Sequence, residues 1–138
     1  PERQKIAELA KKLPTNIEWE IRGHISQDEL IYFYKKQPIN LFIHLSESEG
    51  LPLSIVEAIS FGIPAMASAV GGVPEIISEN SGILLPVELD PEQIAIKIET
   101  FKNSSMNTEV YRKKVKEFWN ENFEAKKNYN YFYQKLVD

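Results

Sequence analysis

The stretch over residues 40–77 constrains the fold more than any other part of the chain. It opens with a nearly continuous apolar run, 40–45, which is typical of a strand buried on both faces of a parallel sheet. A loop and a helix over 52–61 follow, and then come a short strand over 65–68 and a second helix that opens at Val73. This alternation of strands and helices predicts an α/β fold with a parallel sheet.

The segments before this stretch continue the alternation. Apolar residues at helical spacing predict a helix over 1–13, and a second helix over 29–36 is capped by Ser26 or Asp28. Between them, residues 17–23 alternate strictly between apolar and charged side chains. That pattern predicts a strand with one wet face near the edge of a sheet.

The segments after it predict a strand over 83–85, a helix that starts at Pro91 and a polar connector over 103–107. We therefore expect a Rossmann-like, doubly wound parallel sheet over 1–107, followed by a helical tail over 108–138. The tail is rich in aromatic and apolar residues that would cover another surface, among them Tyr129, Phe132, Tyr133 and Leu136.

Composition removes several classes of function. The chain has 138 residues, 43% of them hydrophobic, so it is one globular domain with enough apolar material for a core. The net charge of -4 argues against nucleic acid as the main partner, although short basic clusters leave a weak basic face open. The absence of cysteine excludes disulfides and fits a cytoplasmic location, and no apolar run is long enough to span a membrane. His24 and His44 lack metal-ligand spacing, so we expect no metal site.

The loop over 46–50 carries the chemistry, because ligands of open parallel sheets bind beyond the carboxyl ends of the strands. Gly50 lets a ligand approach the backbone closely. The amides of Gly50, Leu51 and Leu53 lie near the start of a helix, where unpaired N–H groups favour anions such as phosphate. Glu49 is placed to accept hydrogen bonds from sugar hydroxyls, although acidic loop residues are also common without a function.

Glu57 stands in an otherwise apolar helix, and seven residues separate it from Glu49. Buried glutamate is rare unless it is paired, so Glu57 is a candidate for the bottom of a cleft that faces a hydroxyl-rich ligand. The alternative is that it lies on the exposed stripe of the helix or forms a salt bridge.

These residues carry a family resemblance. The run over 46–54, with Glu57-Ala58, Gly62-Ile63-Pro64 and the run over 71–75, resembles the carboxy-terminal domain of family 4 (group 1) glycosyltransferases. These are retaining enzymes built from two Rossmann-like domains, and glutamate, seven residues, glutamate is their signature. The resemblance extends more loosely over residues 1 to about 123.

The resemblance implies roles for individual residues. Glu49 and Glu57, the catalytic candidates, would contact the donor sugar and the ribose hydroxyls, and neither needs to act as an acid or base. Ser48 and the backbone from Gly50 to Leu53 would bind the sugar and the diphosphate. Gly23 and His24 fall where the family holds the nucleobase, although His24 is equally well an ordinary loop residue. We expect Gly71 and Gly72 to be structural, and neither a cofactor nor a metal is implied.

The family also has parts that this sequence lacks, namely a strand–helix unit with an Arg and a Lys for the diphosphate and an acceptor-binding amino-terminal domain. We therefore expect a fragment that is inactive alone. Either the remaining sheet parts close up directly, or a second copy of the chain fills the gap.

The function that the resemblance implies for the parent protein is transfer of a hexosyl-type sugar, with retention, from a nucleotide-sugar donor to an acceptor hydroxyl on a sugar or lipid-linked molecule. Polysaccharide biosynthesis is the family's commonest role, and a lipid-linked acceptor would place the protein at the inner face of the membrane. The alternatives are a non-catalytic nucleotide-sugar-binding module and a nucleotide-sugar epimerase or phosphorylase of the same architecture.

Overall fold

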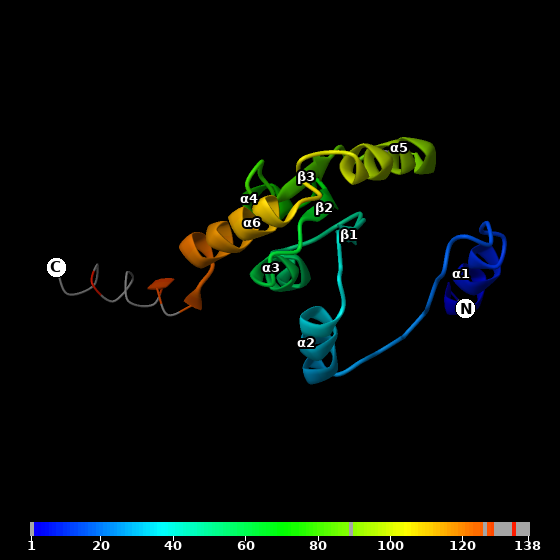
Figure 1. The fold of residues 1–138 in the computed structure, drawn as a ribbon, viewed down its shortest axis with the longest axis horizontal. Coiled ribbons are helices and arrows are strands. Elements are labelled where there is room, and N and C mark those ends of the chain that lie inside the picture. The colour runs from blue at the N-terminus through cyan, green and yellow to red at the C-terminus, as the bar shows by residue number, and fades with distance from the viewer. Residues whose placement is uncertain (1, 89, 126, 129–133, 135–138) are drawn as a thin grey trace. The chain divides into compact units, whose positions relative to one another are not determined.

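The protein forms two compact units, Pro1–Phe33 and Tyr34–Asp138, as described by a computed structural model (Figure 1). Residues 2–88, 90–125, 127, 128 and 134 are described. The predicted aromatic positions of the tail from Tyr129 to Tyr133, and Leu136, lie outside these residues.

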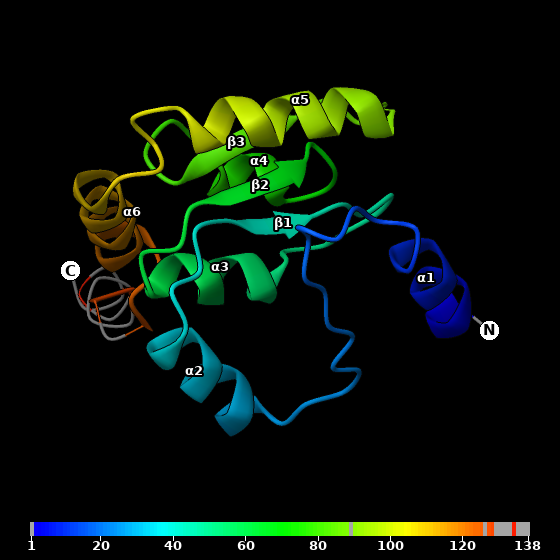
Figure 2. The same ribbon diagram turned by 45° about the vertical axis from the view of Figure 1, so that its right-hand side comes forward.

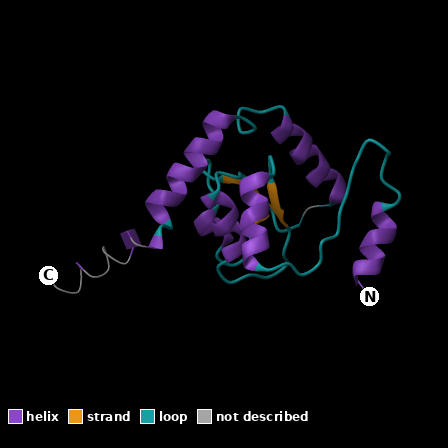
Figure 3. Ribbon diagram, turned by 60° about the horizontal axis from the view of Figure 1, so that its bottom comes forward, coloured by secondary structure: helices purple, strands orange, loops and turns teal. Residues whose placement is uncertain are grey.

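The larger unit contains a parallel three-stranded sheet in the order β1-β2-β3. Each strand is short, and the two crossovers between them run through α3 (Leu53–Ser60) and α4 (Val73–Ile76). The strands lie between helices (Figure 3). Their bounds are Phe42–His44 for β1, Ala65–Ser68 for β2 and Gly82–Leu85 for β3. The predicted α/β class and the parallel sheet are confirmed.

Helices cover both faces of this sheet, as expected for a doubly wound fold. Figure 2 shows the strands between α5 (Pro91–Lys102) and α3, and these two helices contribute to different core clusters. Because side chains alternate along β2, Ala65 and Ala67 join one buried cluster and Met66 joins the other. The cluster with Met66 contains Leu85 and Phe101, and the second cluster gathers residues from α3, α4 and α6 (Glu109–Asn122).

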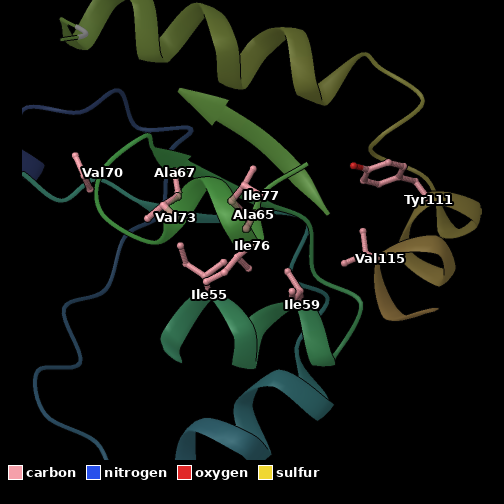
Figure 4. Packing of buried hydrophobic residues seen from close by; sticks show 10 residues of the cluster. All are labelled: Ile55, Ile59, Ala65, Ala67, Val70, Val73, Ile76, Ile77, Tyr111 and Val115. Carbon is pink, nitrogen blue, oxygen red and sulfur yellow. The ribbon is translucent and has the colours of Figure 1, made fainter. Parts of the chain in front are cut away.

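The second cluster is the main core of the larger unit. Figure 4 shows Ile55 and Ile59 pointing from α3 toward the strands, with Val115 of α6 beside them. The remaining labelled members are Ala65, Ala67, Val70, Val73, Ile76, Ile77 and Tyr111. Since this core packs α3 against β2, it fixes the start of α3 at the carboxyl edge of the sheet.

Local sequence signals set the ends of the helices. Pro52 occupies the N-cap of α3, and Gly62 follows the helix with φ +72°, a conformation that glycine adopts without strain. The side chains of Asp90 and Thr108 cap α5 and α6 by accepting hydrogen bonds from backbone N–H groups. The predicted helix over 52–61 is confirmed to within one residue at each end.

The smaller unit contains α1 (Glu2–Ala10) and the first part of α2 (Gln27–Lys36). Ser26 and Glu29 form a capping box, because the amide and hydroxyl of Ser26 donate to the Glu29 carboxylate and the Glu29 amide donates back to Ser26 Oγ. These bonds from Ser26, first from its backbone and then from its side chain, lower the pKa of Glu29. Of the two predicted caps, Ser26 is therefore the one that the structure confirms.

Two sequence predictions about strands are wrong. Residues 17–23 form no strand, and the described sheet takes no strand from this segment. An alternating pattern forms a strand only where a neighbour accepts its backbone hydrogen bonds. The run over 40–45 is also not buried on both faces, because Ile43 is 39% exposed on an edge strand. A second copy at this edge stays a prediction.

The helices after β3 are present, but the predicted apolar stripe of α5 is only partly buried. Phe101 is its one buried residue, whereas Ala95 and Ile98 are exposed. In α6, Tyr111 and Val115 are buried and Trp119 packs against the main core. None of the described helices combines the length and the apolar character needed to cross a membrane.

Candidate functional site

The loop after β1 lies at the carboxyl edge of the sheet and leads into α3. His44 is the last residue of β1, and its register partner is Ala67, whose side chain belongs to the main core on the side of α3. On this side of the sheet, His44 Nε2 lies 2.8 Å from Oε1 of Glu49. Both side chains are mostly buried, with 20% of His44 and 27% of Glu49 exposed. The Glu49 carboxylate is therefore held in place by a residue of the sheet.

The loop after β2 supports the same region through its backbone. Gly71 has φ +51°, and a Cβ at this position would overlap the carbonyl oxygen of Glu49. The next amide, that of Gly72, donates a hydrogen bond of 2.8 Å to the carbonyl oxygen of Gly50. The two loops pack backbone against backbone, which agrees with a structural role for both glycines.

The start of α3 is open to solvent. Leu53 is 73% exposed, Leu51 is also exposed, and nothing lies within 4 Å of the Cβ position of Gly50. No side chain caps this helix, whose N-cap is Pro52. The first N–H groups of an α-helix have no partner inside the helix, so this end offers donors and a partial positive charge to an anion.

Glu57 lies two turns into α3 and is neither buried nor fully exposed. Phe61, one turn further along, contacts Tyr34 of α2 with ring centroids 5.4 Å apart. Burial, and secondly the charge of Glu57, raises the pKa of Tyr34. Glu57 thus lies one helical turn before Phe61, the C-cap residue of α3, which contacts Tyr34 near the end of α2.

A cavity of about 250 Å³ lies at the same edge of the sheet, beyond the ends of all three strands. It is lined by Leu45, Ser46, Glu47, Ser68, Val87 and Ile94, none of which was a predicted site residue. The sequence does contain a signal for this cavity, because a serine stands at or just after the carboxyl end of each of two neighbouring strands. These serines are Ser46 and Ser68.

The other predicted residues are less closely connected. The carbonyl oxygen of Ser48 accepts a hydrogen bond from Ser46 Oγ within the loop. Gly23 and His24 belong to the smaller unit, where Gly23 has φ +71° and its Cβ position lies 3.4 Å from Arg3 Nη1. Within the residues that the structure describes, no three His, Cys, Asp or Glu side chains are grouped as for a metal ion.

The fold and the site together define a Rossmann-like domain whose carboxyl edge offers a fixed carboxylate beside open helix amides. Such an edge suits a ligand that carries both hydroxyls and phosphate. The family model described as "Glycosyl transferases group 1" matches residues 1–118, and the chain belongs to this family.

Individual relatives agree with this assignment. The chain is 32% identical over 111 residues to sulfoquinovosyl transferase SQD2 of Arabidopsis thaliana, a match that covers 78% of the chain and 21% of that protein. It is 33% identical over 86 residues to the GtfA subunit of a UDP-N-acetylglucosamine–peptide N-acetylglucosaminyltransferase of Streptococcus parasanguinis, covering 61% and 16%. The chain thus spans about a fifth of the length of these curated relatives.

Among solved structures, sucrose-phosphate synthase from Thermosynechococcus elongatus is similar to this chain with a TM-score of 0.74 and 25% identity. The match covers 99% of the chain and 34% of that structure.

Proposed function

We propose that the chain forms part of the donor site of a retaining glycosyltransferase, which transfers a hexosyl-type sugar from a nucleotide sugar to an acceptor hydroxyl. The observation that carries this proposal is the Glu49 carboxylate, held by His44 in the loop that leads to the uncapped start of α3. Membership of the family supports the transferase reaction, and the full name of the GtfA relative includes a nucleotide sugar, UDP-N-acetylglucosamine.

Each part of the site has a chemical task in this proposal. The amides at the start of α3 bind the diphosphate, whose negative charge grows as the sugar departs. Glu49 accepts hydrogen bonds from sugar hydroxyls, and Glu57 accepts them from the ribose. The site thus orients the donor and stabilises the leaving group, and it requires neither glutamate to move a proton. It also requires no cofactor, because the nucleotide sugar is the substrate.

The second candidate is a module that binds a nucleotide sugar without catalysis. Its support is that the groups of the site, a held carboxylate and uncapped helix amides, bind and orient a ligand without moving a proton. For the 138 residues taken alone we propose binding without transfer, with the acceptor held by another domain. The relatives reported above are transferases by name, which favours a transferase over an epimerase or a phosphorylase as the parent protein.

The proposal is tested by titrating UDP, GDP and ADP, and hexoses linked to them, into the ¹⁵N-labelled chain. We expect one nucleotide sugar to shift the amide signals of Gly50, Leu51 and Leu53. Glu57→Gln should reduce these shifts, whereas Glu99→Gln, in an exposed pair with Lys102, should leave them unchanged. Unchanged signals at millimolar concentrations of the whole panel would reject a donor site.

Cellular location and assembly belong to the same proposal. A cytoplasmic enzyme that works on a lipid-linked acceptor would sit at the inner face of the membrane, and a second copy would complete the sheet beside β1. Sedimentation at two protein concentrations tests the second copy, because a strictly monomeric chain excludes it.

A further inference from the structure

The contact between His44 and Glu49 joins two different elements. His44 ends β1, and Glu49 lies five residues later in the loop before α3. The imidazole ring also lies nearly parallel to the ring of Phe42, with an angle of 16° and centroids 6.4 Å apart. Since Phe42 packs against the main core, the plane of the His44 ring is fixed from the side of the sheet.

The direction of this hydrogen bond follows from the chemistry of its two groups. An ionised carboxylate only accepts hydrogen bonds. Nε2 of His44 is therefore the protonated ring nitrogen, and its N–H donates the hydrogen bond to Oε1 of Glu49. This hydrogen bond uses one of the two acceptor positions of Oε1. It fixes the direction of the carboxylate, whose other oxygen, Oε2, is the main acceptor for a ligand.

The main chain of Glu49 is fixed as well. Its carbonyl oxygen occupies the space that a side chain at Gly71 would need, and the neighbouring carbonyl of Gly50 accepts from Gly72. The side chain and the main chain of Glu49 are therefore both held by the protein itself. A binding group held in this way loses less conformational freedom when the ligand binds.

We propose that His44 is a positioning residue of the donor site, which aims the Glu49 carboxylate at a hydroxyl of the transferred sugar. This inference rests on the proposed function, because it assigns the ligand of Glu49. The role requires a hydrogen-bond donor at the position of Nε2. Glutamine and asparagine in place of His44 should therefore differ in their effect on affinity for the nucleotide sugar. The amide nitrogen of glutamine lies near the position of Nε2, whereas that of asparagine lies near Nδ1.

The test compares His44→Gln, His44→Asn and His44→Leu by calorimetric titration with the free nucleoside diphosphate and with the nucleotide sugar that the panel identifies. We expect His44→Leu and His44→Asn to bind the nucleotide sugar about tenfold more weakly, the loss of roughly one hydrogen bond. His44→Gln should stay within about twofold of the wild type. Affinity for the free nucleoside diphosphate should not change, because that ligand has no sugar for Glu49 to bind.

A second comparison shows whether His44 acts through Glu49. In a Glu49→Ala background, His44→Leu should cause no further loss of affinity for the nucleotide sugar. Equal losses in His44→Gln and His44→Leu, or equal losses for the two ligands, would overturn the positioning role. Should His44→Leu fail to fold, the difference in nucleotide-sugar affinity between His44→Gln and His44→Asn still tests the positioning role. A wild-type chain that binds no member of the panel would instead reject the proposed function, and this inference with it.

Discussion

Gly71→Ala is the substitution that most directly tests how the site is built. In the structure Gly71 has φ +51°, and a Cβ at this position would overlap the carbonyl oxygen of Glu49. The clash is with backbone and not with the end of a flexible side chain. Relief therefore requires that the loop after β2 or the loop that carries Glu49 moves.

The expected loss of stability has two parts. Placing alanine in the left-handed region costs about 1–2 kcal/mol, and forcing extra volume into a packed contact costs about 1–3 kcal/mol. We therefore expect the free energy of unfolding to fall by about 2–5 kcal/mol. This is a large part of the roughly 5–15 kcal/mol that stabilises a typical domain.

The measurement is urea unfolding followed by tryptophan fluorescence, since Trp119 packs against the main core. The matched control is Gly50→Ala, at the neighbouring loop position, where no atom lies within 4 Å of the new Cβ and φ is not positive. Its free energy of unfolding should change by less than about 1 kcal/mol. If Gly71→Ala is as stable as Gly50→Ala, the close packing of the two loops is not present in solution.

Three further predictions concern the site and the core. Gly50→Ala, although stable, should weaken nucleotide-sugar binding because its methyl group occupies the open surface before α3, and titration against the wild type measures this. Glu57→Gln should lower affinity for the nucleoside diphosphate by about tenfold or more, whereas unchanged affinity would remove Glu57 from the ribose. Burial, and secondly the charge of Glu79, raises the pKa of Tyr111 to about 12. Because folding favours the neutral phenol, its contribution to stability is complete below the pKa of an unfolded tyrosine, about 10, and is lost as the pH rises from about 10 to about 12. The urea midpoint of unfolding should therefore fall more between pH 8 and pH 11 in the wild type than in Tyr111→Phe, which has no phenol to ionise.

The central α/β segment is predictable from sequence because its signals are local. The strand over 65–68 matches β2 residue for residue, since an apolar run lies between Gly62 and Pro64 on one side and a glycine pair on the other. Glycine and proline residues of this kind end a helix or strand independently of distant segments of the chain. The helix of Glu57 follows from the same kind of signal, with Pro52 at its start and Gly62 after its end.

The errors come from interactions that depend on distant segments. The alternating residues 17–22 have the pattern of a strand, yet a pattern does not supply the neighbouring backbone that a strand needs. Ile43 is exposed for the same reason, because burial of an edge strand depends on what covers it. The pairing of His44 with Glu49 was missed because His44 stands inside an apolar run, where a histidine is easily taken as a residue of the core.

The rigidity of the candidate site has its source inside the larger unit. Glu49 is held through its side chain by β1 and through its main chain by the loop after β2, and both contacts are made by the protein itself. Binding should therefore leave the backbone over 46–51 where it is, and the largest change should be at the exposed amides of α3. Amide hydrogen exchange separates this arrangement from a loop that folds around its ligand. If the site is rigid, the Gly72 amide, which donates to the carbonyl oxygen of Gly50, is protected from exchange to the same degree before and after a nucleotide sugar is added. If the loop folds around its ligand, the protection of this amide increases when the nucleotide sugar is added.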